Sequence, residues 1–411
     1  MTEESRDGEV LIEVKGMKKW FPIKEGMLSA AKSYVRAVDG VDLQIKRGET
    51  LGIVGESGCG KTTLGRVLLG LIPITDGSVL YGGEDIRTIP DRELRRKMQI
   101  VFQDPGGSMN PRMSVRAIVG EPLQVNRLAE GAELTQKVAD VLDSVGLKRE
   151  HMNRFPHEFS GGQKQRLALA RSLSLDPEFI LLDEPTSSLD VSVQAQVLNL
   201  LEEIQEKRGL TFVFITHALN VVNHISDRVA VMYLGKIVEI ADTNNLFSEP
   251  AHPYTHALMS AIPEPSLEKA SRGRIVLGGD VPSPADPPPG CRFHTRCPIA
   301  EEGLCDVEEP KLESIGEGHS VACHWAQGRN SRLSAMTRFP RRMTTARKRS
   351  YSEVKEWLRT KPTRTGARPP LLRCSTRRRR PKPPSGGLRR PLTRAERSES
   401  SEFWLRMARV F

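Results

Sequence analysis

The sequence has no long apolar stretch. None of its apolar runs approaches the roughly 18 residues that a helix needs to span a bilayer. Its first ten residues, MTEESRDGEV, are polar and acidic and lack the apolar core of a signal peptide. We therefore expect a protein that is soluble or attached only to a membrane surface.

The last part of the chain has few acidic residues. Residues 329–411 contain 25 Lys and Arg against 5 Asp and Glu, which leaves 36 against 46 for residues 1–328. The net charge of +10 thus hides an acidic main part, and we expect no nucleic-acid partner for it. The tail is rich in Arg, Pro, Ser and Thr and cannot bury enough apolar surface to fold. It is either a disordered basic extension or an out-of-frame translation, and a nucleic-acid-binding tail is the rival function that it suggests.

A glycine-rich motif is the strongest signal that is present. Residues 55–62 read GESGCGKT and fit G-x-x-x-x-G-K-[ST], a loop whose backbone amides surround nucleotide phosphates. The apolar run before it predicts a buried strand, and the periodicity after it predicts a helix. The positive end of such a helix favours a polyanion. Lys61 can reach the β- and γ-phosphates, and the Thr62 hydroxyl can bind Mg²⁺.

A second motif supplies carboxylates. The apolar run of residues 179–182 predicts a buried strand that ends at Asp183 and Glu184. Ligands bind at the carboxyl ends of parallel strands, so Asp183 would hold Mg²⁺ and Glu184 would orient or deprotonate the attacking water. Ser160 fits the N-cap of a further helix. Two phosphate-binding helix starts in one chain predict that two copies face each other and complete each other's sites.

Strands alternate with helices over most of the chain, which predicts an α/β fold with helices on both faces of the sheet. We predict a P-loop ATPase domain with a mixed sheet over residues 1–245, with a helical subdomain at about 104–172. A small cysteine-bearing domain would follow over residues 246–328, and the tail would occupy 329–411.

The ordered motifs resemble the ATP-binding subunit of an ATP-binding cassette (ABC) transporter. The matching motifs are, in chain order, the phosphate loop (55–62), the glutamine loop (Gln103), the LSGGQ signature (159–163), the second nucleotide motif (180–184), the D-loop (187–190) and the switch histidine (His217). Departures are mild, and the main ones are Phe159 for the usual Leu and Ala218 for the usual Asp.

The resemblance implies a head-to-tail dimer with two ATP molecules, each lying between Lys61 of one subunit and Ser160 of the other. The catalytic residues implied are Glu184, His217, Gln103 and Lys61, and the Mg²⁺ ligands are Thr62, Gln103 and Asp183. Other implied ATP contacts are Gly55, Glu56, Ser57, Gly58, Cys59, Gly60, Thr63, Gly161, Gly162, Gln163 and Asp190. An aromatic residue would stack on adenine, and Phe21 fits best, with Trp20 as the rival and a structural role for either as the alternative.

Further stretches resemble peptide-importer ATPases. They are VFQDPGGSMNPRMSV (101–115), HPYTHALMSAIPEP (252–265) and GCRFHTRC (290–297), and the insertion at 22–35 resembles the second ATPase of oligopeptide and dipeptide systems. The implied partners are two membrane permease subunits, a second ABC ATPase of a different sequence and an extracellular substrate-binding protein. The implied location is the cytoplasmic face of the cell membrane. The alternatives are an ABC-type ATPase without a permease, and an importer of nickel chelates or oligosaccharides.

Four of the six cysteines fall close together, at Cys291, Cys297, Cys305 and Cys323. Four thiolates can hold zinc or an iron–sulfur cluster. The gaps are not those of a zinc ribbon, and the resemblance implies a [4Fe–4S] cluster. Zinc and metal-free buried thiols are the alternatives.

Overall fold

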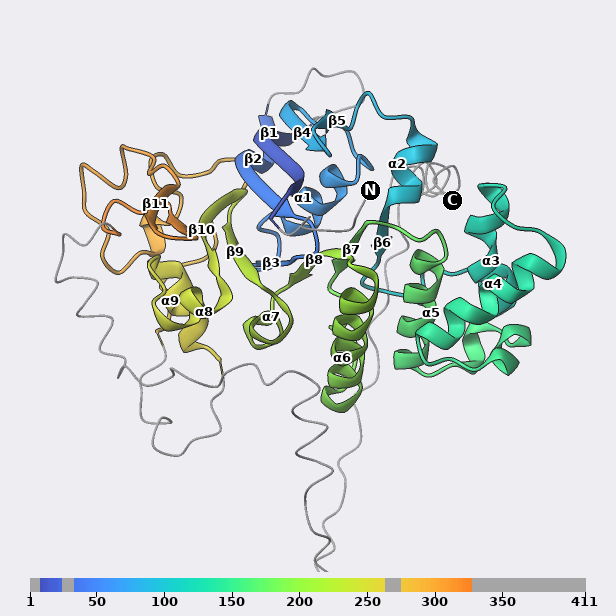
Figure 1. Ribbon diagram of the computed structural model, residues 1–411. Helices are drawn as coiled ribbons and strands as arrows, with labels where there is room; N and C mark the ends of the chain where they lie inside the picture. The colour runs from blue at the N-terminus through green and yellow to red at the C-terminus, as the bar shows by residue number, and fades with distance from the viewer. Residues whose placement is uncertain (1–7, 24–32, 263–274, 327–411) are drawn as a thin grey trace, which may run out of the picture. The chain divides into compact units, whose positions relative to one another are not determined.

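Two β-sheets form the frame of the molecule (Figure 1). The computed structural model describes residues 8–23, 33–262 and 275–326, so the predicted tail and most of the predicted insertion lie outside the described residues. The larger sheet has the order β11-β12-β10-β9-β3-β8-β7-β6, and the smaller one has the order β2-β1-β4-β5. Five neighbouring strands of the larger sheet, from β9 to β6, run parallel, whereas the smaller sheet is antiparallel. The predicted α/β fold with a mixed sheet is confirmed.

Strands and helices alternate along the chain from β7 to β9, as the periodicity predicts. The strands are β1 (Val10–Ile23), β2 (Ser33–Lys46), β3 (Thr50–Val54), β4 (Asp76–Tyr81), β5 (Glu84–Asp85), β6 (Met98–Val101), β7 (Phe179–Asp183), β8 (Thr211–Thr216), β9 (Arg228–Tyr233), β10 (Lys236–Asp242), β11 (Glu313–Gly316) and β12 (His319–Val321). The α-helices are α1 (Lys61–Leu68), α2 (Asp91–Lys97), α3 (Val115–Val125), α4 (Gly131–Ser144), α5 (Gly161–Leu173), α6 (Val191–Arg208), α7 (Leu219–Ile225), α8 (Thr243–Ser248) and α9 (Pro253–Ser260). Short 3₁₀ turns are η1 (Arg149–Asn153), η2 (Pro156–Glu158) and η3 (His294–Arg296).

The parallel strands bring distant segments to one edge of the sheet. Every residue of β3, β7 and β8 is buried, because helices cover both faces of a parallel sheet. All three strands point the same way and are paired side by side. The residues that follow them, which include Gly55, Glu184 and His217, therefore meet at the carboxyl edge.

The helices α3, α4 and α5 pack against one another and share a buried apolar core with parts of β7, α6 and β8. The serines Ser114 and Ser160 cap α3 and α5 by accepting hydrogen bonds from backbone amides of the first turn. This region falls within the predicted helical subdomain, whose bounds stay a prediction.

The C-terminal segment joins the larger sheet. Strand β12 pairs with β10, so strand pairing crosses the predicted boundary at 245/246, and that boundary stays a prediction. The fully buried Glu239 of β10 accepts hydrogen bonds from the backbone amides of Ala251 (2.7 Å) and His252 (2.9 Å) and lies 2.8 Å from His319 Nε2. His252 caps α9 through Nδ1, and burial lowers its pKa to about 4. A buried polar network therefore fastens the segment.

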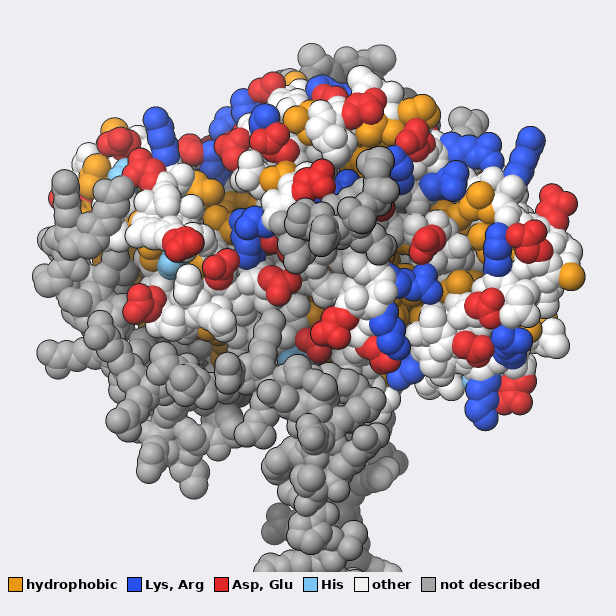
Figure 2. Space-filling view, in the orientation of Figure 1, with side chains coloured by type: hydrophobic (Ala, Val, Ile, Leu, Met, Phe, Trp, Pro, Cys, Tyr) orange, Lys and Arg blue, Asp and Glu red, His pale blue; other side chains and the backbone are white. Residues whose placement is uncertain are grey.

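Charges of both signs are interspersed over the face of the described residues shown in Figure 2. Among the described residues, no helix combines the length and the apolar character needed to span a membrane.

Candidate functional site

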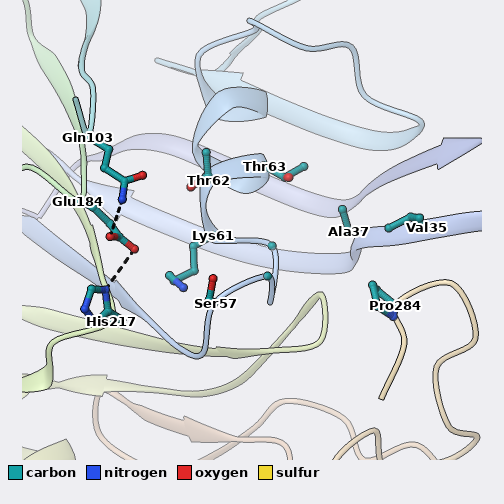
Figure 3. A pocket seen from close by; sticks show the side chains of 12 residues that line it. Val35, Ala37, Ser57, Lys61, Thr62, Thr63, Gln103, Glu184, His217 and Pro284 are labelled. Atoms are coloured by element: carbon teal, nitrogen blue, oxygen red, sulfur yellow. Dashed lines mark hydrogen bonds and ion pairs between the residues drawn. The ribbon is translucent and has the colours of Figure 1, made fainter. Parts of the chain in front are cut away.

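A pocket of about 540 Å³ opens at the carboxyl edge of the larger sheet (Figure 3). The phosphate loop and the start of α1 form its floor. Gln103, Glu184 and His217 lie at one end (Figure 3). Val35, Ala37 and Pro284 lie at the other end, with Lys61 between the two groups. The remaining lining residues are Ser57, Gly58, Gly60, Thr62 and Thr63.

The phosphate loop has the geometry that its glycines predict. Gly55 and Gly60 have positive φ angles of 155° and 109°, where a side chain would be strained. A Cβ on Gly55 would lie 2.1 Å from the Met232 carbonyl oxygen, so only glycine fits. The ammonium group of Lys61 donates hydrogen bonds to the carbonyls of Gly55 (2.8 Å) and Glu56 (2.9 Å). These bonds hold the positive charge over the loop, where a phosphate would bind.

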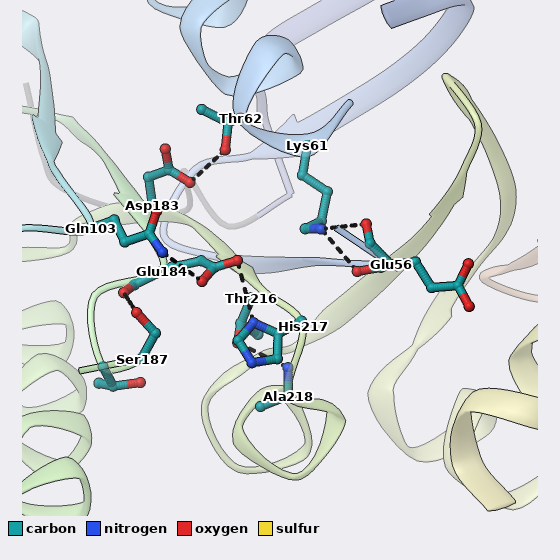
Figure 4. A network of polar contacts seen from close by, with 12 residues as sticks. Glu56, Lys61, Thr62, Gln103, Asp183, Glu184, Ser187, Thr216, His217 and Ala218 are labelled. Atoms are coloured by element: carbon teal, nitrogen blue, oxygen red, sulfur yellow. Dashed lines mark hydrogen bonds and ion pairs between the residues drawn. The ribbon is translucent and has the colours of Figure 1, made fainter. Parts of the chain in front are cut away.

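Two oxygen donors meet beside the loop. The Thr62 hydroxyl donates a hydrogen bond to the Asp183 carboxylate at 3.0 Å (Figure 4). Burial raises the pKa of Asp183 above its ordinary value, while the hydrogen bond from Thr62 opposes that shift. Hard oxygen ligands of this kind, completed by nucleotide phosphates and water, are what Mg²⁺ prefers. Thr62 and Asp183 therefore fit the magnesium ion that an ATP site implies.

The Glu184 carboxylate is held by two side chains from neighbouring segments. Gln103 Nε2 donates a hydrogen bond to it at 3.1 Å, and His217 Nδ1 lies 3.3 Å from its other oxygen (Figure 4). Glu184 has a φ of +48°, a left-handed conformation that costs a non-glycine residue about 1–3 kcal/mol. Its amide donates to the Ile215 carbonyl at 2.9 Å, which holds this conformation and directs the carboxylate into the pocket.

The two candidate adenine-stacking residues lie on opposite faces of the β1–β2 hairpin. Phe21 pairs with Val35, and Trp20 pairs with Arg36, and paired residues of antiparallel strands share a face. Phe21 is exposed and on the face of pocket-lining Val35, whereas the Trp20 indole donates to Asp39 at 2.9 Å. The geometry favours Phe21 over Trp20, although Phe21 itself does not line the pocket.

The signature residues lie away from this pocket. Ser160, Gly161, Gly162 and Gln163 begin α5 and are absent from the pocket lining. Ser160 and Gln163 form a capping box, with Ser160 N donating to Gln163 Oε1 at 3.0 Å. Beside them, Asp190 caps α6 by accepting from Val193 N at 3.0 Å. Their predicted contact with ATP therefore requires a nucleotide other than the one in the same chain's pocket.

The structure gives no support for the predicted metal site at the four cysteines. Burial, with a smaller effect from the neighbouring thiols, raises the pKa of Cys297 and of Cys323 to about 12. Within the described ranges, no three or more Cys, His, Asp or Glu residues are arranged to hold a metal ion. The predicted iron–sulfur cluster and zinc site therefore have no support here. In the structure, Cys59 and these four cysteines are free thiols.

Several pocket contacts are missing from the sequence prediction. Pro284 lines the pocket, Tyr254 accepts a hydrogen bond from the phosphate loop, and Arg296 pairs with Glu56. Tyr254 and Arg296 belong to the stretches at 252–265 and 290–297 that resemble peptide-importer ATPases. Nothing in their local sequence indicates contact with residues about 200 positions earlier.

Comparison with known proteins gives matches over most of the chain. The family described as ABC transporter matches residues 38–187, and the one described as oligopeptide/dipeptide transporter, C-terminal region, matches residues 238–305. The oligopeptide transport ATP-binding protein AppF of Bacillus subtilis is 49% identical over 321 residues, which cover 77% of this chain and 97% of that protein. The dipeptide transport ATP-binding protein DppF of Haemophilus influenzae is 47% identical, with 79% and 99% covered.

A solved structure shares the cassette fold. The ATP-binding cassette MJ0796, determined as a dimer in a post-hydrolysis state bound to ADP and Pi, aligns with a TM-score of 0.50 and 29% sequence identity. The alignment covers 56% of this chain and 98% of that one.

Proposed function

Because the chain belongs to the ABC transporter family of ATPases and carries the oligopeptide/dipeptide transporter C-terminal region, we propose that it hydrolyses ATP to power the import of oligopeptides or dipeptides. The observation that carries the ATPase part is the position of Glu184, held between Gln103 and His217 at the end of the pocket beyond Lys61. The peptide substrate is taken from the names of the relatives, which are transport proteins for oligopeptides and dipeptides.

In the proposed mechanism the triphosphate lies along the floor of the pocket. Lys61 keeps its bonds to the Gly55 and Glu56 carbonyls and donates its remaining N–H to phosphate oxygens, and the helix end adds backbone amides. When bound, Mg²⁺ neutralises charge that develops on the phosphates, and Thr62 and Asp183 would hold it. The Glu184 carboxylate orients the attacking water or accepts its proton. Gln103 and His217 hold this carboxylate in place and keep it near the terminal phosphate.

The proposed assembly has two ATPase subunits. Ser160 and its neighbouring amides lie outside their own pocket, so a second subunit would bring them to the phosphates in a head-to-tail dimer. The dimeric cassette that shares the fold supports this arrangement. We infer that the second ATPase is a different chain, that two permease subunits contact the region near Gln103, and that a substrate-binding protein delivers peptide from outside. The complex would place this chain at the cytoplasmic face of the cell membrane.

The test compares the wild-type chain with Glu184→Gln in ATP hydrolysis and in light scattering. We expect the variant to lose turnover by at least about a hundredfold and to accumulate as an ATP-bound dimer. The control is Glu206→Gln, which makes the same change on an exposed glutamate of α6 and is expected to leave both measurements unchanged.

A Glu184→Gln variant that hydrolyses ATP at the wild-type rate would contradict the role assigned to Glu184. If the wild-type chain neither hydrolyses ATP nor dimerises with it, the assay is repeated with a candidate partner ATPase. If the two chains together also fail to hydrolyse ATP, the proposed function is overturned.

A further inference from the structure

Residues of the C-terminal segment contact the phosphate loop directly. We call Tyr254, Pro284 and Arg296 the C-terminal clamp. The Glu56 amide donates a hydrogen bond to the Tyr254 hydroxyl at 2.9 Å. The Arg296 guanidinium donates to both Glu56 carboxylate oxygens, at 2.8 and 3.2 Å. This two-bonded geometry fixes the orientation of the carboxylate as well as its position.

Glu56 carries the contact on to the residue that binds phosphate. Its amide is held by Tyr254 and its carboxylate by Arg296, and its carbonyl accepts a hydrogen bond from the Lys61 ammonium at 2.9 Å. All three polar groups of Glu56 are thus engaged. Because the same short loop segment holds the clamp on one side and Lys61 on the other, a displacement of Glu56 displaces the Lys61 ammonium.

The clamp rests on a rigid support. Tyr254 is fully buried, and the Arg296 side chain is only 8% exposed. The ring of Tyr254 lies 4.8 Å from that of Tyr233 and 5.4 Å from that of Phe293, within the range of favourable aromatic pairs. Since these rings come from β9, α9 and the segment before η3, the clamp moves only if this aromatic cluster moves.

Pro284 forms part of the pocket wall at the end away from Glu184 (Figure 3). Its carbonyl accepts a hydrogen bond from the Arg36 amide at 2.9 Å, which fastens it beside Val35 and Ala37 of β2. The side chains at this end are apolar, whereas the opposite end carries Gln103, Glu184 and His217. An apolar wall suits a planar base and offers no charge to a phosphate.

We propose that the C-terminal clamp is a working part of the ATP site. Arg296 and Tyr254 are positioning residues that act on Lys61 through Glu56, and Pro284 contacts the base of the nucleotide. This inference rests on the proposed function, namely that the pocket binds ATP. It assigns to the C-terminal segment a role in nucleotide affinity, separate from any role of its cysteines.

The two parts of the clamp predict different responses to two ligands. The full chain is titrated with ATP and with inorganic tripolyphosphate, both with Mg²⁺, and the dissociation constants are compared. We expect Arg296→Gln to weaken binding of both ligands by about fivefold to tenfold, since the phosphate loop binds the three phosphates that both ligands contain. We expect Pro284→Gly to weaken ATP binding by about threefold and to leave tripolyphosphate binding unchanged, since tripolyphosphate has no base.

Three further variants separate positioning from general stability. Arg296→Lys keeps one charged donor and is expected to recover part of the lost affinity. Glu56→Gln is expected to weaken binding as Arg296→Gln does, and the double variant to be no worse than either single one. Glu309→Gln breaks an ion pair between the C-terminal segment and Lys236 that does not touch the loop, and it should bind both ligands as the wild type does.

The outcomes distinguish the clamp from the function on which it depends. A wild-type chain that binds neither ligand overturns the proposed function. A wild type that binds ATP, together with a folded Arg296→Gln variant of unchanged affinity, overturns the clamp alone. If Arg296→Gln does not fold, Glu56→Gln decides, because Glu56 lies at the surface of the loop and its side chain is 28% exposed. Additive losses in the double variant would also overturn the clamp.

Discussion

Replacing Gly60 with alanine tests whether the phosphate loop needs its glycines for geometric reasons. Gly60 is the N-cap of α1 and has a φ of +109°, where an L-residue is strained by about 1–2 kcal/mol. A Cβ there would also lie 2.1 Å from the Ala37 carbonyl oxygen and 2.8 Å from Met232 Cε. Real Cβ atoms are essentially never closer than 3.0 Å to such an atom, so the loop and β2 must separate by about 0.9 Å.

The separation acts on both stability and activity. Overpacking of this kind costs about 1–3 kcal/mol, which with the strain predicts a total loss of about 2–5 kcal/mol in the free energy of unfolding. A displacement of about 1 Å in a phosphate-binding loop lowers turnover by on the order of a hundredfold. Urea unfolding and the kcat/KM of ATP hydrolysis measure the two effects separately.

Gly48→Ala is the matched control for strain alone. Gly48 has a φ of +72°, and nothing lies within 4 Å of the position of its Cβ. We expect this variant to lose about 1 kcal/mol of stability and to keep wild-type turnover. The geometric reasoning is refuted if Gly60→Ala is as stable as Gly48→Ala and hydrolyses ATP within threefold of the wild-type rate.

Three further predictions follow from packing and burial. Gly162→Ala would place a Cβ 2.3 Å from Val193 Cγ1, so we expect lower stability and lower ATPase activity. Adding Val193→Ala in the same chain removes the clash and should restore both. A double variant without recovery would contradict this explanation. His252 stays neutral in the folded protein because its pKa is about 4, whereas the unfolded chain takes up a proton below about pH 6.5. Stability therefore falls as the pH drops through this window, by about 2 kcal/mol between pH 7.5 and pH 5 from this group alone, and His252→Asn should lose correspondingly less in urea titrations at the two pH values. Burial raises the pKa of Asp183, and Mg²⁺ binds the carboxylate rather than the protonated acid. The Mg²⁺ concentration for half-maximal ATPase activity should therefore rise on acidification. Asp183→Asn should weaken Mg²⁺ binding and remove most of this pH dependence.

The sequence predicts the residues of the site that follow directly from short motifs. The phosphate loop, Asp183 with Glu184, and His217 each follow a buried strand, and strand direction alone then brings them to one edge of the sheet. Gln103 is placed at the same edge by the same argument, since it follows β6. Local sequence is sufficient for the phosphate loop and for Asp183 with Glu184, whereas Gln103 and His217 are predicted through the family resemblance.

The contacts that surround the phosphate loop and the pocket depend in part on segments that local sequence does not bring together. Tyr254 and Arg296 reach Glu56 across 198 and 240 residues, and no periodicity indicates that these segments meet. The adenine-stacking prediction shows the same limit. Phe21 and Trp20 are neighbours in sequence, and only the register of β1 on β2 separates their faces. The cysteine prediction stays without support for a related reason, because spacing gives the number of thiols but not their arrangement.

The long separation between Glu56 and Arg296 has a consequence for how the protein is made. At about 5–20 residues per second, a ribosome needs roughly 12–50 s to add the 240 residues between them. During that interval the nascent phosphate loop lacks its clamp, and until β8 and β9 have been made it also lacks the two strands that pair with β3. A chain released before Arg296 would thus carry every short motif of the cassette but lack the Arg296 contact to Glu56. If the clamp acts as proposed, chains that end early would bind ATP more weakly than finished chains.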